Sequence, residues 1–448
     1  MILLMACSSP PSGDLVVLHT NDMHGRIEPE KATWLDGDPA IGGLRALGAA
    51  LAGHRRSGDV LVLDGGDLLS GTPYAELERG GAVGGAMVEV LDVVGYDAWA
   101  VGNHEFDKGV PNLEALLGHS TVPALSANVS PVLDGAVTST VVTKGELRIG
   151  IVGVLTEDLT SVVAPSRLGE ARATSVAEAV GPELERLDAD TDLLVVLSHI
   201  GIKADKQLAE AVPGIDLIVG GHSHTPMKEA ERVGDTWIVQ AGSYARSLGT
   251  VRLRVEEDRI ASLEYALVDL VEEPTDVPQP VDALYEELRT AVAAEWDVPI
   301  GVAEEDLREG RNVQSDMGRW ACARLREAAG TDIAVYNSGG LRAPLFAGEL
   351  TRRDVFAVFP FDNAVVTFRL SAEDTAALAA RAGGDIQHAG LPEPLEDRPY
   401  TVSTNSFMYE KWDEFVPGTT PLDVSIEPRT VREVMEEAVR AAPVRREP

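Results

Sequence analysis

Short runs of Val, Ile and Leu recur from Asp14 to Asp269 and are separated by Gly- and Ala-rich segments with helical periodicity. The runs alternate little between apolar and polar positions, which is typical of strands buried on both faces of a sheet. They read LVVLHT, VLVLDGG, AWAVGN, ALSAN, RIGIVGV, LLVVLSH, LIVGGH and WIVQAG. Because helices between such strands must cover both faces, the pattern predicts a layered α/β domain.

The pattern changes towards the end of this domain. LGTVRLRVEEDRIASLEYALVDL predicts a closing hairpin with its turn at Glu257 and Asp258. The proline-rich stretch VEEPTDVPQP predicts a linker, and the periodicity of VDALYEELRTAVAAEW predicts a connecting helix. Strand-like and helix-like segments then alternate again, as in a second, smaller α/β domain. We therefore expect a spacer at 1–13, a first domain at 14–272, a linker and helix at 273–297 and a second domain at 298–448.

Composition narrows the classes of function. The 448 residues are enough for more than one domain, and 44% of them are hydrophobic, as in a globular protein. The 38 basic and 72 acidic residues give a net charge of −34, which argues against binding a nucleic-acid polymer through a broad basic face. An anionic substrate must therefore be attracted by a local positive site. The two distant cysteines, Cys7 and Cys322, predict no disulfide framework.

The first residues, MILLMACSSPPSGD, resemble the cleavage box of a bacterial lipoprotein. In that resemblance an apolar run precedes Cys7, which becomes the lipidated first residue, and a Ser/Pro/Gly spacer follows. No other stretch approaches the ~18 apolar residues of a membrane-spanning helix. We therefore expect an exported protein of the periplasm or cell surface, attached to the membrane only through a lipid on Cys7.

Five of the apolar runs end in residues that bind metals. Ligand sites in open α/β sheets form beyond the carboxyl ends of the strands, so these side chains are expected to converge. Singly, each has a structural explanation: Asp67 fits a helix cap, and His199 fits a buried structural histidine. Their recurrence at five strand ends favours one metal centre. The candidates are Asp22 and His24 in HTNDMHG, Asp67 in DGGD, Asn103 and His104 in GNHE, His199 in LSHIG, and His222 and His224 in GGHSHTP.

This set of donors also indicates the chemistry. Carboxylate, amide and imidazole ligands together suit Zn, Mn, Fe or Co. A bridging carboxylate holds two such ions roughly 3.5–4 Å apart, where they polarise a phosphoryl oxygen and lower the pKa of a bound water. Two divalent ions would also supply the positive field that the acidic chain lacks.

The motifs resemble those of calcineurin-like metallophosphoesterases and, more narrowly, the 5′-nucleotidase family, through LHTNDMHGRIEP, VGNHEFDKG and GGHSHTP. The resemblance implies a four-layer domain of two sheets sandwiched by helices, followed by a smaller α/β substrate-binding domain. It implies that His104 and Asp107 form a catalytic dyad, whereas Glu105 and Phe106 shape the turn. It assigns Asp22, His24 and His224 to the first metal, Asp67 as the bridge, and Asn103, His199 and His222 to the second metal.

The second domain carries further matches in GRNVQSDMGRW and NSGGLRAPLFAGELTRRDVFAVFPFDN. They imply that two arginines bind phosphate or nearby polar atoms, that an amide and the following glycine turn contact the base, and that aromatic side chains clamp it. The residues are Arg311, Arg342, Asn337, Gly340, Phe361 and Phe407, and Asp413 is expected to take the place of the family's aspartate in this segment. In TNSFMYEKWDEF the glycine pair of the family is replaced by Lys411 and Trp412, which leaves base recognition open.

The resemblance implies a phosphohydrolase that releases inorganic phosphate from nucleoside 5′-monophosphates. Three related activities fit the same metal motifs: 2′,3′-cyclic-nucleotide phosphodiesterase with 3′-nucleotidase activity, UDP-sugar hydrolysis, and cleavage of a sulfur ester. The alternative outside enzymes is a nucleotide-binding lipoprotein that has lost its metals. That alternative predicts broken ligand motifs, and all seven positions carry a ligand-type residue.

Overall fold

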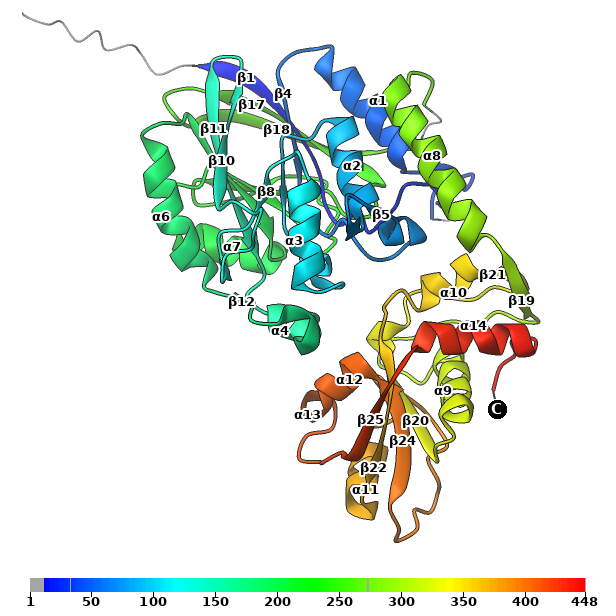
Figure 1. Cartoon of the computed structure of the whole chain (residues 1–448). Coiled ribbons are helices and arrows are strands. Elements are labelled where there is room, and N and C mark those ends of the chain that lie inside the picture. The colour runs from blue at the N-terminus through cyan, green and yellow to red at the C-terminus, as the bar shows by residue number, and fades with distance from the viewer. Residues whose placement is uncertain (1–11, 33, 272–273, 448) are drawn as a thin grey trace, which may run out of the picture. The chain divides into compact units, whose positions relative to one another are not determined.

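The computed structural model describes residues 12–32, 34–271 and 274–447, so Cys7 and its lipoprotein-like motif lie outside the described residues. The chain separates into two compact units (Figure 1). Unit 1 comprises the described residues up to Ser70 and Tyr74–Thr290, and unit 2 comprises Gly71–Pro73 and the residues from Ala291 onwards. The division falls within helix α8 (Gln279–Trp296). None of the helices in the described part of the chain combines the length and apolar character needed to cross a membrane.

Unit 1 is built on two six-stranded sheets. The first has the order β18 (Ile260–Asp269), β17 (Ser247–Val255), β1 (Gly13–Thr20), β4 (Val60–Asp64), β7 (Ala98–Ala100), β8 (Ala124–Leu125). The second has the order β10 (Ser139–Lys144), β11 (Leu147–Leu155), β13 (Leu193–His199), β14 (Leu217–Gly220), β16 (Thr236–Gln240), β15 (Glu231–Val233). Three short ribbons accompany them: β2–β3 (Glu30–Lys31, Ala40–Ile41), β5–β6 (Glu78–Arg79, Ala82–Val83) and β9–β12 (Val129–Ser130, Arg172–Ala173).

Aliphatic side chains from both sheets of unit 1 form one core cluster, which includes Val17, Leu63, Val195 and Val219. The sheets therefore pack face to face, and the low alternation of the strands follows from burial of the opposite faces under helices. Figure 1 shows α1, α2 and α3 on one side and α6 and α7 on the other. The helices are α1 (Leu44–Arg55), α2 (Gly85–Val94), α3 (Val110–His119), α4 (Leu159–Val162), α5 (Pro165–Leu168), α6 (Val176–Asp188) and α7 (Ile202–Ala211).

Parallel pairing places the strand ends of unit 1 together. In the first sheet β1, β4 and β7 are parallel neighbours, and Thr20 lies opposite Asp64. In the second sheet β11, β13 and β14 are parallel, and Leu155 lies opposite His199. The carboxyl ends of parallel strands meet at one edge of their sheet, which is where the ligand-type residues follow. The predicted hairpin is present as β17 and β18, with Glu257 and Asp258 at its turn.

Unit 2 is a smaller three-layer α/β unit. Its five-stranded sheet has the order β23 (Ile386–Ala389), β20 (Ile333–Asn337), β24 (Tyr400–Asn405), β22 (Ala364–Leu370), β25 (Leu422–Thr430). One core cluster joins α9 and α14 to the sheet, and another joins α11 and α12 to the opposite face. The remaining elements are β19 (Pro299–Ala303), β21 (Gly348–Thr351), α9 (Asp316–Ala329), α10 (Arg352–Val358), α11 (Ala372–Arg381), α12 (Ser406–Glu410), α13 (Trp412–Phe415) and α14 (Val431–Ala441). The predicted fold class, a layered α/β domain followed by a smaller one, is confirmed.

Candidate functional site

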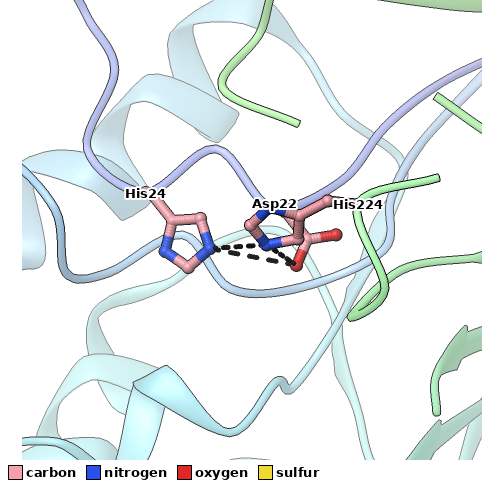
Figure 2. A group of neighbouring side chains, drawn as sticks. All are labelled: Asp22, His24 and His224. Carbon is pink, nitrogen blue, oxygen red and sulfur yellow. Dashed lines mark hydrogen bonds and ion pairs between the residues drawn. The ribbon is translucent and has the colours of Figure 1, made fainter. Parts of the chain in front are cut away.

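Asp22, His24 and His224 lie together beyond the ends of β1 and β14 (Figure 2). Nε2 of His24 lies 3.2 Å from Nε2 of His224, and Nε2 of His224 lies 3.3 Å from Oδ1 of Asp22. Asp22 and His24 are buried. The structure therefore brings together the three residues that the resemblance assigns to the first metal.

Asp67, His199 and His222 form a second group, and Asp67 also belongs to a group with His24 and His104. Nε2 of His199 lies 3.1 Å from Oδ2 of Asp67. Asp67 thus lies between the two predicted metal positions. Asn103, which directly precedes His104 after β7, is buried, and its Oδ1 has no hydrogen-bond partner in the described part of the chain.

The hydrogen bonds of the histidines fit metal ligation. Nδ1 of His24 lies 3.0 Å from the carbonyl oxygen of Leu69, and Nδ1 of His199 lies 2.7 Å from that of Gly65. A carbonyl only accepts, so Nδ1 carries a proton in each ring, and Nε2 is the ring nitrogen that remains to bind a cation. Nε2 of His199 is buried and makes no hydrogen bond among the described residues. A divalent cation would satisfy this nitrogen and Oδ1 of Asn103, which is also unpartnered among the described residues.

Five of the ligand-type residues have left-handed backbones. Asp22, His24, Asp67, His222 and His224 have φ values of 53°, 49°, 57°, 72° and 52°. A non-glycine residue in this region costs about 1 kcal/mol or more, so the surrounding structure must hold it there. Strain of this kind gathers at functional sites, where the chain must turn sharply to return a side chain to the pocket.

The electrostatics of the centre depend on burial and on two carboxylates. Burial lowers the pKa of His24 to about 3. Burial acts in the same direction on His199, but Asp67 and Asp22 outweigh it and raise its pKa to about 10. In Asp67, burial raises the pKa, whereas His199 and His104 hold it well below the usual range. The two buried carboxylates thus favour positive charge at this position, and a divalent cation that binds Nε2 of His199 would displace its proton.

His104 and Asp107 are paired at the edge of this centre. Nδ1 of His104 lies 2.7 Å from Oδ2 of Asp107, and the two side chains are 16% and 18% exposed. The backbone N–H of His104 donates to Oδ1 of Asp67 over 2.9 Å. The structure therefore brings the predicted dyad next to the predicted bridging carboxylate.

Glu105 ties the loop after β4 to the loop after β7. Its fully buried carboxylate accepts from the backbone N–H groups of Asp67, Leu68, Leu69 and Gly102 over 2.7–3.2 Å. The expectation that Glu105 shapes the turn therefore has a geometric basis. Buried Phe106 packs beside it in the same short 3-10 turn, His104–Phe106.

Two amides that the sequence reasoning did not single out hold the ligand loops in place. Oε1 of Gln240 accepts from Oγ of Ser223 and from the N–H of Thr225, and its Nε2 donates to the carbonyl of Gly221. The side chain of Asn21 accepts from the N–H of Ala241 and donates to Asp22. Both are buried. Their position within WIVQAG and HTNDMHG is the only sequence signal for them.

The other histidines lie outside the candidate centre. His19 is buried with neither ring nitrogen bonded in the described part of the chain, and its ring stacks on Tyr265 at 5.9 Å. His119 pairs with Glu89 over 3.2 Å. His54 and His388 are partly buried, which lowers the pKa of each.

In unit 2, Asn337 ends β20 and lies beside Asn405, which ends β24: Nδ2 of Asn405 donates to Oδ1 of Asn337 over 2.9 Å. Gly339 lies close to both Arg311 and Asn337, because a Cβ atom at Gly339 would be 3.5 Å from Nη1 of Arg311 and 3.6 Å from Nδ2 of Asn337. Gly340 is buried in the same turn. Three of the predicted substrate-binding residues therefore gather around one glycine turn.

A cavity of about 500 Å³ adjoins this turn. It is lined by Arg381, Asp385, Ile386, Glu414 and Phe415. Its link to the turn is Asp385, which accepts hydrogen bonds from the side chain of Ser338 through Oδ1 and from the N–H of Ser338 through its carbonyl. Sequence reasoning did not predict this cavity.

The segment after β24 folds as two short helices. Trp412 packs in the core, with its ring edge-on to Phe368 at 4.8 Å. Lys411 is buried and places Nζ 5.1 Å from the ring centre of half-buried Phe407. Asp413 is exposed, and its Oδ1 accepts from the N–H of Gly418. Of the two residues that stand where the family has its glycine pair, Trp412 therefore packs in the core and Lys411 contacts the ring of Phe407.

The guanidinium groups of Arg311 and Arg342 have neither an ion pair nor a hydrogen bond within the described residues, a property shared with Arg26 and Arg252. Arg342 lies 5.9 Å from the ring centre of Phe361. In a chain with 72 acidic residues, an arginine without an acidic partner has its charge available to an anionic ligand. Arg311 and Arg342 are both exposed.

The matches to known protein families fall on two separate parts of the chain, one in unit 1 and one in unit 2. The calcineurin-like phosphoesterase family model matches residues 15–226, and the model of the 5′-nucleotidase C-terminal domain matches residues 292–391. Protein 5NUC of Lutzomyia longipalpis is 28% identical over 83% of this chain and 74% of its own length. Protein UshA of Yersinia enterocolitica is 28% identical over 79% of this chain and 73% of its own length.

A solved structure described as a 5′-nucleotidase precursor from Thermus thermophilus superimposes with a TM-score of 0.82. It is 25% identical to this chain, and the match covers 96% of both chains. Both family models, the full-length structural match and the cluster of Asp and His side chains agree. The chain therefore belongs to the calcineurin-like phosphoesterases that carry a 5′-nucleotidase C-terminal domain, a family of metal-dependent phosphoesterases.

Proposed function

We propose that this protein is a dinuclear-metal phosphohydrolase that releases inorganic phosphate from nucleoside 5′-monophosphates. The observation that carries the proposal is the position of Asp67 between two groups of ligand-type side chains, one with His24 and one with His199. The relatives described as 5′-nucleotidases support the substrate class.

The residues fit two divalent ions. Asp22, His24 and His224 would hold one, Asn103, His199 and His222 would hold the other, and Asp67 would contact both. When bound, such ions polarise the phosphoryl oxygens and lower the pKa of water. The mixture of oxygen and imidazole donors suits Zn, Mn, Fe or Co.

The chain's own groups then act on the substrate. Nδ1 of His104 is held by Asp107, so in the doubly protonated ring Nε2 is the atom that would donate a hydrogen bond to the phosphoryl group or a proton to the leaving oxygen. In unit 2, Arg311 and Arg342 would bind phosphate, because neither guanidinium has an ion pair in the described part of the chain. Asn337 and Gly340 would contact the base. Phe361 and Phe407 would stack on the base, and Asp413 would bond to the nucleoside.

Two alternatives use the same metal groups. A 2′,3′-cyclic-nucleotide phosphodiesterase and a UDP-sugar hydrolase differ from a 5′-nucleotidase in the leaving group, which unit 2 must recognise. Buried Lys411 beside Phe407 is the departure from the family pattern that favours these two alternatives. A nucleotide-binding protein without catalysis is the third alternative.

One experiment separates these activities. Purified protein loaded with Mn or Zn is offered 5′-AMP, 3′-AMP, 2′,3′-cyclic AMP and UDP-glucose, and the nucleoside, nucleotide and phosphate products are separated and measured. The proposal expects the highest kcat/KM for 5′-AMP. Preference for the cyclic nucleotide or for UDP-glucose would favour the corresponding alternative, and hydrolysis of none of the four would overturn the hydrolase proposal.

We also propose export with a lipid on Cys7, supported by the motif around it. Cys7 lies outside the described residues. Metabolic labelling with a palmitate analogue tests the proposal, which expects label on the wild type and none on Cys7→Ala.

A further inference from the structure

Ser70 lies against the His104–Asp107 pair from a different part of unit 1. It follows β4 by six residues, and its Oγ donates a hydrogen bond to Oδ2 of Asp107. This is the same oxygen that lies 2.7 Å from Nδ1 of His104. One carboxylate oxygen therefore joins the hydroxyl and the imidazole, so the pair is in fact a chain of three side chains.

The backbone of Ser70 is held to the metal-ligand loops on its N-terminal side. The N–H of Leu69 donates to Glu105, and the carbonyl of Leu69 lies 3.0 Å from Nδ1 of His24. Ser70 itself has a φ of 66°, in the left-handed region that is unfavourable for a residue with a Cβ. Its hydroxyl is therefore aimed at Asp107 by a backbone that the rest of the site restrains.

Asp107 needs such an anchor. Its carboxylate is 18% exposed and lies at the end of a short 3-10 turn, so rotation about its last torsion is not blocked by burial. A hydroxyl that donates to Oδ2 fixes the plane of the carboxylate, which in turn fixes the plane of the His104 ring.

We propose that Ser70 is a positioning residue for the reaction, which acts through Asp107 to orient Nε2 of His104. The inference rests on the proposed function, in which His104 assists the leaving oxygen. A poor leaving group, such as the 5′ oxygen of a nucleoside, needs this assistance, whereas 4-nitrophenolate leaves without a proton. Ser70 should therefore matter for kcat on 5′-AMP and much less for 4-nitrophenyl phosphate.

The test compares Ser70→Ala and Ser70→Gly with the wild type on both substrates. A hydrogen bond to a charged group is worth enough to change a rate by about 10-fold to 100-fold when it is realised in the transition state. We expect both variants to lose about 10-fold or more in kcat on 5′-AMP, with KM and bound metal unchanged, and to lose less than about 3-fold on 4-nitrophenyl phosphate. Glycine relieves the left-handed backbone, so an equal loss in both variants assigns the effect to the hydroxyl.

Ser126→Ala is the matched control. Its Oγ is buried in unit 1 and makes no hydrogen bond among the described residues, so removing it should leave both rates unchanged. Equal losses on the two substrates, a loss confined to KM, or recovery in Ser70→Gly alone would each overturn the proposal.

A second measurement does not depend on catalysis. In the Zn-loaded protein, ¹⁵N NMR of the His104 ring reports which nitrogen carries the proton and how fast that proton exchanges. The proposal expects faster exchange at Nδ1 in Ser70→Ala than in the wild type, and unchanged exchange would overturn it. If no nucleotide is hydrolysed but the NMR change occurs, the proposed function fails and the positioning by Ser70 stands.

Discussion

Nε2 of His199 lies 3.1 Å from Oδ2 of Asp67, and both side chains are buried. His199 ends β13 of the second sheet, whereas Asp67 follows β4 of the first. The candidate metal centre therefore exists only because the two sheets pack face to face with their strand ends at a common edge. Its chemistry depends on the packing of the core between the sheets.

Asp67→Asn should reduce activity more than the loss of any residue outside the centre. Asp67 belongs to two groups of ligand-type atoms. The amide of an asparagine is neutral, so it lacks the negative charge with which a carboxylate bridges two cations. Changes beyond the ligands themselves already lower metal affinity or activity by about 10-fold to 100-fold, so we expect at least about 100-fold here. Phosphate release and metal content measure it. The control is His119→Ala, which removes an ion pair with Glu89 and should leave activity and metal content unchanged. A fully active Asp67→Asn would refute the bridging role.

Chelation should lower the melting temperature. The centre buries the like-charged Asp22 and Asp67 together and holds ligand residues in left-handed conformations. A cation that binds only the folded chain offsets both the charge repulsion and the backbone strain. A ligand present at 100 times its Kd stabilises a fold by about 2.7 kcal/mol. Differential scanning fluorimetry should show a fall with EDTA that Mn or Zn reverses. An unchanged melting temperature after verified metal removal would contradict this.

Asp205→Asn should make stability less dependent on pH. Asp205 is fully buried, its Oδ1 accepts from Ser198 over 2.5 Å, and its Oδ2 has no partner in the described part of the chain. Burial raises its pKa from 3.8 to about 7. A carboxyl whose pKa is raised on folding stabilises the fold below its unfolded pKa, and this contribution is lost as pH rises through about 7.

Asp205→Asn has no carboxyl to ionise, so its free energy of unfolding does not fall for this reason as pH rises. At saturating metal the variant should therefore gain stability relative to the wild type between pH 5 and pH 8. Urea unfolding at the two pH values measures the difference. A constant difference at both pH values would show that Asp205 does not titrate in this range.

Arg342→Ala and Arg311→Ala should raise KM for 5′-AMP and change kcat little. Neither guanidinium makes an ion pair or a hydrogen bond within the described residues, so no internal ion pair is broken by the change. A hydrogen bond to a charged group is worth about 1.5–3 kcal/mol, which corresponds to roughly a 10-fold to 100-fold rise in KM. Arg252→Ala is the matched control, because Arg252 is equally unpaired but lies within β17. An equal effect of all three variants would indicate a general electrostatic contribution.

Gln240→Ala should weaken metal binding without touching a ligand. Gln240 bonds to Gly221, Ser223 and Thr225, which flank His222 and His224. We expect metal affinity to fall by about 10-fold to 100-fold. Isothermal titration calorimetry with Mn or Zn measures it, and unchanged affinity would mean that the loop holds its shape without this amide.

Much of this architecture could be predicted because the signals are local. A buried parallel strand must be apolar on both faces. The segments LLVVLSH and VLVLDGG show this pattern within a few residues. The donor set of Asp22, His24 and His199 is likewise a property of single side chains. The two-domain α/β fold and the family both follow from such patterns.

The tertiary structure alone decided which of these side chains meet. Ser70 and Asp107 are 37 residues apart, and Gln240 supports a loop 15 to 19 residues before it, so no periodicity reveals either contact. In unit 2, Trp412 takes a place in the core because Phe368 lies opposite it, whereas the motif alone suggested only a lost glycine. Chain-local patterns determine which faces are buried and which donors are available. The pairing of distant residues depends on how the sheets and loops pack, which no local pattern contains.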